Sequence, residues 1–196
     1  MATDLNNLNS QGKKAIRDFV GDIVSVESGI EETLDRQLKM GQDNPTFHAA
    51  VQRFHDAVKA SRDAARSYRD QLGADEEGAN TLVEKGTEAL GAITGMIQKL
   101  RAEGLSKTMR DDYNLFNTAA IAYTTLHTSA MALGDSATET FAANGLRTYA
   151  RLVQDINNII PEIVVDELRK DNHIIANPMA AEQCRKEIDR IWKEAS

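Results

Sequence analysis

Glu27 is the residue of this sequence whose position most suggests chemistry, because it is a carboxylate in the middle of an apolar helical face. That face is made by hydrophobic residues at the 3.6-residue spacing of a helix: Ile16, Val20, Ile23, Ile30 and Leu34. An isolated buried carboxylate costs several kcal/mol unless it is paired, hydrogen-bonded, bound to a metal or neutralised. The pattern therefore predicts that Glu27 is either a metal ligand or a core carboxylate with hydrogen-bond partners.

A metal centre in a helical bundle needs inward ligands from several helices, typically one Glu from each of two helices and a Glu-x-x-His pair from each of the other two. The sequence contains no Glu-x-x-His or Asp-x-x-His. The positions expected to face Glu27 from the other helices are not routine ligands for iron or zinc: Val58, Ala119 and Tyr149. We therefore expect no metal and no cofactor. If a rearranged site exists around Glu27, its candidate ligands are Glu27, Glu31 and His55.

The alternative to a metal is a polar core formed by Glu27, Arg62 and Tyr149. A buried tyrosine hydroxyl usually has a hydrogen-bond partner. We expect the hydroxyl of Tyr149 to be hydrogen-bonded to Glu27. Arg62 lies one helical turn beyond Val58 and is the candidate charge partner, either inside the core or from its edge.

Other catalytic motifs have little support in the sequence. The single cysteine, Cys184, has no histidine near it in the sequence and no nucleophile elbow around it. No Gly-x-Gly-x-x-Gly or Walker-type loop occurs, so these motifs indicate no nucleotide site. We expect a protein that is not an enzyme.

Composition limits the class of the protein and its partners. The chain has 196 residues, three prolines, 5% aromatic residues and a formal net charge of −7. These values favour an almost wholly helical protein and argue against nucleic acid as a partner, which needs a basic surface. One cysteine excludes a disulfide framework. No signal-peptide pattern and no membrane-spanning apolar run occur, so we expect a cytoplasmic protein of bacterial type without membrane contact.

Stop signals divide the chain into helices that must position these residues. Gly and Pro residues, with a capping-box-like start at Asp135 or Ser136, predict four long helices and a shorter helical connector between the second and the third. The expected helices cover 11–40, 46–72, 106–133 and about 136–160, with the connector at 78–103. At Pro161 we expect a kink or a restart of the helix. The predicted fold is all-α: a flexible N-terminus at 1–10, a four-helix bundle at 11–165 and a C-terminal extension at 166–196.

The extension contains a strongly amphipathic helix at about 178–195. Its apolar face must be covered, either by the chain's own bundle or by a second copy of the protein. In the second case Trp192 is the candidate interface anchor. We expect a homo-oligomer, and this helix is also the candidate contact for another protein partner.

One family resembles the chain in several places. The run Ala-Ala-Ile-Ala-Tyr-Thr-Thr-Leu-His-Thr-Ser-Ala-Met-Ala-Leu-Gly-Asp at 119–135 resembles the third-helix signature of ferritin-like proteins of the YciE/YciF type. The segment Asp-Ile-Val-Ser-Val-Glu at 22–27 and the helix around His55 are similar to that family's first and second helices. Pro161 falls where the family's fourth helix ends. The resemblance covers about 15–165 and implies a ferritin-like four-helix bundle with a di-metal site and a link to stress responses.

The metal ligands that the resemblance implies are largely missing. Glu27 matches the ligand of the first helix, but the expected acidic positions in the third and fourth helices hold Ala119, Thr148 and Tyr149. The candidates in the second helix are not acidic either: Val58, Lys59 and Ala60. The expected function is therefore a non-enzymatic, stress-linked structural or interaction role without a functional di-metal centre. The alternative is a metal-binding or oxidase-type ferritin-like protein with a rearranged site around Glu27.

Overall fold

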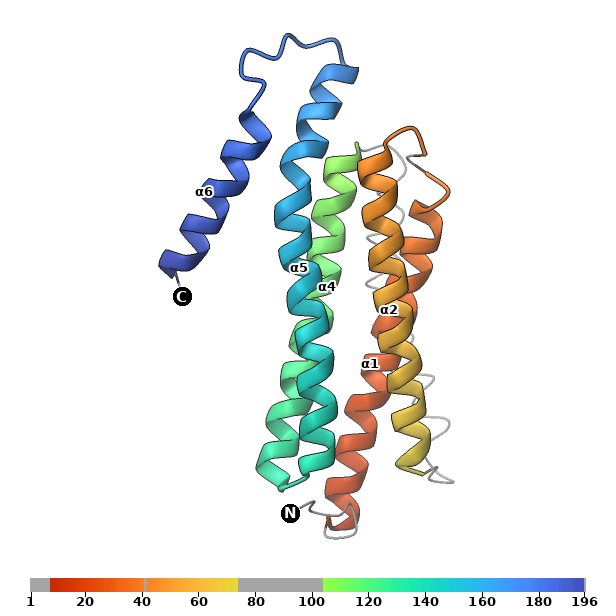
Figure 1. Cartoon of the computed structure of the whole chain (residues 1–196). Helices are drawn as coiled ribbons and strands as arrows, with labels where there is room; N and C mark the ends of the chain where they lie inside the picture. Colours follow the sequence, from red (N-terminus) through yellow and green to blue (C-terminus); the bar gives the residue numbers. More distant parts are fainter. Residues whose placement is uncertain (1–7, 41, 74–103, 196) are drawn as a thin grey trace.

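The chain folds into an all-α structure (Figure 1). A computed structural model describes residues 8–40, 42–73 and 104–195. Within these ranges the helices are α1 (Ser10–Gln37), α2 (Pro45–Gln71), α4 (Leu105–Leu133), α5 (Ser136–Lys170) and α6 (Ala180–Ala195). The helical class predicted from composition is confirmed, and most helix ends lie within a few residues of those predicted. The connector predicted at 78–103 lies outside the described residues.

The helix ends follow from local chemistry. Asn44 caps α2 by accepting a hydrogen bond from the backbone N–H of Phe47, and Pro45 occupies the first turn. Gly134 ends α4 in a left-handed conformation with φ of 73°, which a residue without a side chain adopts at little cost. Asp135 then caps α5 directly, so α4 and α5 form a tight antiparallel hairpin.

Four of the helices pack side by side in a ring. α1 and α2 form one hairpin, α4 and α5 form the other, and contacts between α1 and α4 and between α2 and α5 close the ring. α1 and α4 are antiparallel, because Glu27 meets Tyr123 at one level and Gln37 meets Asp112 at another. α2 and α5 are antiparallel as well. As a result α2 ends and α4 begins at opposite ends of the bundle (Figure 1).

The core lies between these four helices, and the predicted apolar faces form most of it. All five hydrophobic residues predicted for the face of α1 are buried. α2, α4 and α5 also turn apolar side chains toward this core, whereas Leu133 at the end of α4 is exposed. The largest fully buried side chains are Tyr123, Tyr149, Phe47, Phe54 and Phe116.

Pro161 does not end α5, and the predicted helix end near 160 is wrong. The helix continues to Lys170 with Pro161 inside it. Proline removes one hydrogen bond to the carbonyl four residues earlier, on Asn157, and costs about 3 kcal/mol inside a helix. The continuation buries Ile163 and Val165. Because each such side chain contributes about 1.5–3 kcal/mol on burial, the extension offsets the cost of the proline.

α6 lies outside the ring and contacts only part of α5. Arg185 approaches Glu162 of α5 at 3.7 Å, and α6 then diverges from α5 toward the C-terminus (Figure 1). No residue of α6 is buried. Ile191 and Trp192 keep about half of their surface exposed, at 51% and 49%. None of the helices in the described part of the chain has the length and apolar character needed to cross a membrane.

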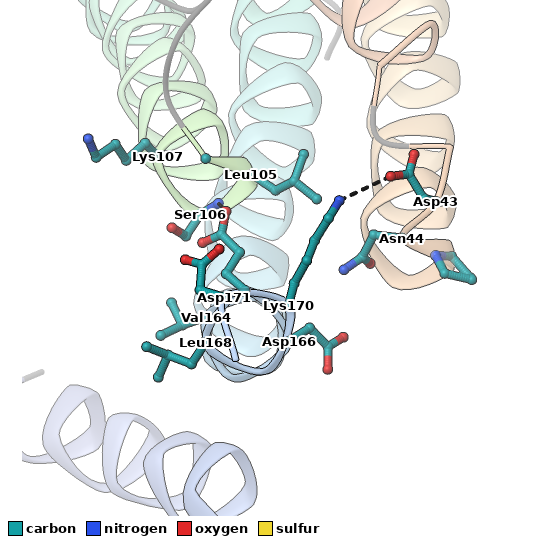
Figure 2. A pocket seen from close by; sticks show the side chains of 13 residues that line it. Asp43, Asn44, Leu105, Ser106, Lys107, Val164, Asp166, Leu168, Lys170 and Asp171 are labelled. Atoms are coloured by element: carbon teal, nitrogen blue, oxygen red, sulfur yellow. Dashed lines mark hydrogen bonds and ion pairs between the residues drawn. The ribbon is translucent and has the colours of Figure 1, made fainter. Parts of the chain in front are cut away.

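A hollow of about 820 Å³ lies at one end of the bundle (Figure 2). Lys170, at the end of α5, pairs with Asp43 in the turn before α2 at 3.0 Å. Glu167 accepts a hydrogen bond from the backbone N–H of Ser106 at 3.3 Å. These contacts hold the start of α4 and the turn before α2 against the last turns of α5.

Candidate functional site

Glu27 is completely buried at the centre of the bundle and is surrounded by hydroxyl groups. Its Oε1 accepts hydrogen bonds from Ser61 Oγ at 2.6 Å, Tyr123 Oη at 2.9 Å and Tyr149 Oη at 3.0 Å. The rings of Tyr123 and Tyr149 are stacked with centroids 5.8 Å apart, which brings both hydroxyls to one oxygen. We call these four residues the Glu27 cluster. It takes one side chain from each of the four helices in the ring.

The sequence predicted one bond of this cluster and missed two. The hydrogen bond from Tyr149 to Glu27 is present as predicted. Tyr123 lies in the 119–135 run that resembles the third-helix signature, but no partner was predicted for its hydroxyl. Ser61 was not singled out, although it follows Val58 by three positions and so lies on the same side of α2. A search for hydroxyls on inward-facing positions would have found both.

Burial dominates the electrostatics of the Glu27 cluster. Removal from water raises the pKa of Glu27 to about 7, and the hydrogen bonds from Ser61, Tyr123 and Tyr149 oppose this rise. Burial, followed by the neighbouring carboxyl of Glu27, also raises the pKa of both tyrosines, so they remain protonated donors. Glu27 Oε2 is buried and has no hydrogen-bond partner among the described residues. A proton on Oε2 therefore leaves the cluster neutral below about pH 7.

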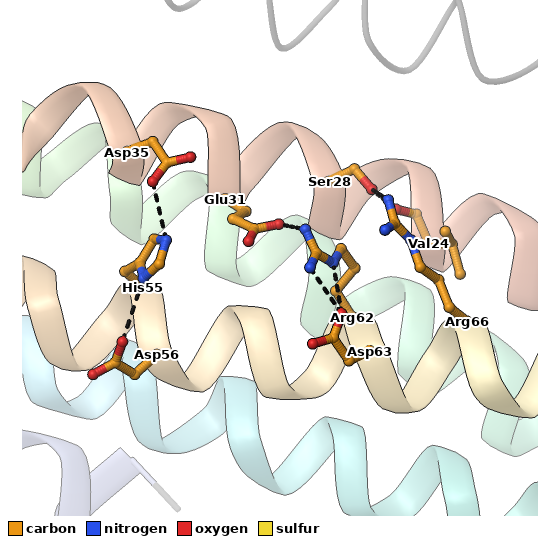
Figure 3. A network of polar contacts seen from close by, with 9 residues as sticks. All are labelled: Val24, Ser28, Glu31, Asp35, His55, Asp56, Arg62, Asp63 and Arg66. Carbon is orange, nitrogen blue, oxygen red and sulfur yellow. Dashed lines mark hydrogen bonds and ion pairs between the residues drawn. The ribbon is translucent and has the colours of Figure 1, made fainter.

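Arg62 does not pair with Glu27. Its guanidinium contacts Glu31 of α1 and also Asp63 at 2.8 Å (Figure 3). The side chains of Arg62 and Glu31 are 14% and 11% exposed, so this pair lies at the edge of the α1–α2 interface. Arg62 acts on Glu27 only as a nearby positive charge, the smallest of the influences that lower its pKa. Of the three residues predicted for the polar core, Glu27 and Tyr149 are hydrogen-bonded to each other, and Arg62 lies at the edge of the interface.

His55 also pairs along the α1–α2 interface and not with Glu27. Its Nε2 lies 3.1 Å from Asp35 Oδ1, and its Nδ1 lies 3.4 Å from Asp56 Oδ1 (Figure 3). Together with Glu31–Arg62 and a hydrogen bond from Arg66 to Ser28, this contact forms a row of polar pairs that joins α1 to α2.

The donor set around Glu27 does not fit the di-metal centre of ferritin-like proteins. In the residues that the structure describes, no three His, Cys, Asp or Glu side chains come together to hold a metal ion. Glu31 and His55 have other partners, and Glu27 Oε1 accepts three hydroxyl donors. A di-metal site in a bundle needs carboxylates and imidazoles from several helices. The proposed rearranged set of Glu27, Glu31 and His55 is therefore not assembled.

Asp112 is a second buried carboxyl, and it was not among the site residues predicted from the sequence. Gln37 Nε2 donates to Asp112 Oδ1 at 2.7 Å, and both side chains are almost completely buried. Burial raises the pKa of Asp112 to about 8. The other two oxygens of the pair, Asp112 Oδ2 and Gln37 Oε1, have no hydrogen-bond partner within the part of the chain that the structure describes. Protonation of Asp112 removes a charge from this buried position, so the neutral acid suits it. The available signal was spacing, because Asp112 lies four residues before buried Phe116 on α4.

The arrangement can hold helices in register and bind or release protons near neutral pH. It joins all four helices of the ring at the level of Glu27 and joins α1 to α4 at the level of Asp112. No family model, curated protein or solved structure matches the chain. The case for a function therefore rests on the fold, the Glu27 cluster and the surface of the molecule.

Proposed function

We propose that this protein is a ferritin-like four-helix bundle without a functional di-metal centre, which acts as a non-enzymatic structural or interaction protein. The observation that carries the proposal is the Glu27 cluster. At the level where a metal-binding bundle gathers carboxylates and imidazoles, the other three helices present Ser61, Tyr123 and Tyr149. Hydroxyl groups satisfy one carboxyl oxygen, so the core is stabilised at this level by side chains of the chain itself.

The order of the helices supports the ferritin-like part of the proposal. Two antiparallel hairpins, α1–α2 and α4–α5, pack so that the neighbours in the ring are antiparallel. The second helix of the first hairpin ends at one end of the bundle, and the first helix of the second hairpin begins at the other. Ferritin-like bundles have one long crossover, which gives their helices the same order of directions: up, down, down, up. The link to stress responses comes from the resemblance to the YciE/YciF type.

The interaction part of the proposal rests on α6, and its expected occupant is a second copy of the chain. The apolar side of α6 is half exposed at Ile191 and Trp192. α6 carries four acidic and four basic side chains, so its formal charge is zero in a chain of net charge −7. Two α6 helices can therefore meet without the repulsion that the acidic bundles impose. A self-complementary contact of this kind forms a symmetric dimer.

Size-exclusion chromatography with light scattering on the full chain tests this assembly. We expect the mass of a dimer or higher oligomer for the wild type and of a monomer for Trp192→Glu. Ile174→Glu is the matched control, because Ile174 is 96% exposed and lies in the segment before α6. The control is expected to keep the wild-type mass. A monomeric wild type, or loss of assembly in both variants alike, would contradict the role of α6.

A metal-binding or oxidase-type function is the second candidate, and one observation favours it. Glu27 Oε2 has no hydrogen-bond partner among the described residues and is buried at the centre of the bundle. Incubation with Fe(II), Mn(II) or Zn(II) followed by metal analysis separates the two candidates. Stoichiometric metal that disappears in Glu27→Ala would favour the second.

A further inference from the structure

A groove runs between α2 and α5 on the surface above the Glu27 cluster. These helices are antiparallel, with Tyr68 hydrogen-bonded to Thr138 at 2.7 Å near one end and Thr46 to Glu162 at 3.3 Å near the other. Between these contacts the two helices leave a groove of about 560 Å³. This volume lies in the range of small-molecule sites in proteins.

The groove is open because the side chains at its walls are small. α2 presents Ala57, Ala60 and Ala64 toward it, and α5 presents Gly145. A Cβ atom at position 145 would overlap the ring of Tyr123. The absence of a side chain there lets the Tyr123 ring reach the floor of the groove.

The floor is suited to an apolar group. Ser61 and Tyr123 both line the groove, and both direct their hydroxyl hydrogens inward to Glu27. They therefore have no O–H to offer to a ligand in the groove. Beside them lie Phe141 and Leu152, so the floor combines an aromatic ring with apolar side chains.

One end of the groove carries two arginines. Arg53 comes from α2 and Arg151 from α5, and the register set by the two inter-helix hydrogen bonds places Arg53 opposite the stretch from Arg151 to Asp155. Arg53 donates one hydrogen bond to the carbonyl of Ala49, which leaves most of its donors available. The lining holds two positive side chains and one negative, and the guanidinium groups lie on both sides of the groove.

We propose that this groove binds an amphipathic organic anion, a carboxylate or sulfonate with an apolar body, with the anion between Arg53 and Arg151 and the body over Tyr123. Guanidinium groups suit this anion because they offer parallel donors to two oxygens. The apolar body covers the alanine walls and the aromatic floor. The proposal adds a ligand site to the proposed structural function and does not depend on α6.

Titration of the full-length protein with sodium octanoate tests the proposal, with binding followed by NMR at the backbone amide of Gly145. We expect a saturable shift of this resonance and at least tenfold weaker binding to Arg53→Gln/Arg151→Gln. Arg36→Gln is the control, because Arg36 is an exposed arginine on α1 that pairs with Glu32. Its affinity is expected to equal that of the wild type. Octanol, which has the same apolar body without the charge, is expected to bind at least tenfold more weakly.

A second variant tests the location of the apolar body. Ala60→Leu adds a large side chain to the groove wall at an exposed position and is expected to abolish the Gly145 shift. Ala150→Leu, an exposed position of α5 outside the groove lining, is the control and is expected to bind normally. The proposal is wrong if octanoate causes no saturable shift, if octanol binds as tightly as octanoate, or if the affinity survives both Ala60→Leu and the double arginine variant.

Discussion

At the scale of single residues, the two buried carboxyls make the bundle sensitive to pH. Glu27 and Asp112 have pKa values of about 7 and about 8, against ordinary values of 4.5 and 3.8. The folded state therefore holds these two protons more tightly than the unfolded state. Stability falls as the pH rises from the unfolded to the folded pKa of each group, by about 1.4 kcal/mol per pH unit and per group.

Glu27→Gln is expected to remove the share of this pH dependence that Glu27 contributes. A glutamine keeps an oxygen for the three hydroxyl donors and carries no charge at any pH. The free energy of unfolding, measured with urea, should be lower at pH 8 than at pH 5 for the wild type. For the variant this decrease should be smaller by about 3 kcal/mol. Glu32→Gln makes the same chemical change at an exposed position of α1 and should behave as the wild type. If the stability of Glu27→Gln and of the wild type changed equally between pH 5 and pH 8, Glu27 would already be ionised in the folded protein at pH 5, which contradicts the prediction.

Asp112→Asn is expected to be tolerated and to stabilise the protein at pH 8. Asparagine keeps an oxygen that can accept from Gln37 Nε2, and like the protonated acid it carries no charge, so its burial costs no more at pH 8 than at pH 6. Asp112→Leu leaves the buried amide of Gln37 without a partner and should cost about 1–3 kcal/mol. Asp111→Asn, on the neighbouring and less buried residue, is the control. A strong loss of stability in Asp112→Asn at pH 6 would mean that the charged carboxylate is required.

Part of this site could be predicted from the sequence, for physical reasons. Glu27 is recognisable because a charge interrupts an otherwise apolar helical face, and Tyr149 because a large inward side chain carries a hydroxyl. To predict the contacts of Ser61 and Tyr123 with Glu27, one must know how the helices are aligned with one another. The spacing of residues within one helix does not determine this alignment. Asp112 was hidden among neighbouring charged and polar residues, and only its burial distinguishes it from Asp111.

At the scale of helices, α4 and α5 can pack closely because α5 has a glycine, Gly145, where it meets the inward side of α4. Gly145 lies against the ring of Tyr123, where a Cβ atom would overlap three ring atoms. Helix limits were predictable because caps, glycines and prolines act locally. Pro161 was the exception, since the gain from burying Ile163 and Val165 comes from tertiary packing.

Gly145→Ala is expected to destabilise the protein by about 1–3 kcal/mol, although alanine favours a helix over glycine by about 1 kcal/mol. The added methyl group forces the Tyr123 ring away from α5 and lengthens its hydrogen bond to Glu27. Thermal unfolding of the two single variants and of Gly145→Ala/Tyr123→Ala checks the cause. In the Tyr123→Ala background the alanine at 145 should have little cost or a small benefit. An equal cost in both backgrounds would exclude the ring as its source.

At the scale of the whole molecule, the proposed interaction role draws on two features: a core level closed by the chain's own hydroxyl groups, and a helix with no buried residue. The ring of four helices uses the Glu27 cluster to join its members, and α6 remains outside it with a half-exposed apolar side. The sequence predicted the amphipathic character of α6 but left open what covers it, because the pattern within a helix says nothing about its partner.

Native mass spectrometry of the full chain, after incubation with Fe(II), Mn(II) and Zn(II) and removal of the excess, measures chain number and metal content together. We predict that the wild type has the mass of two or more 21.6 kDa chains with no metal bound. Trp192→Glu is predicted to have the mass of a single chain. A single wild-type chain that carries one or two metal ions, lost in Glu27→Ala, would contradict the proposed function.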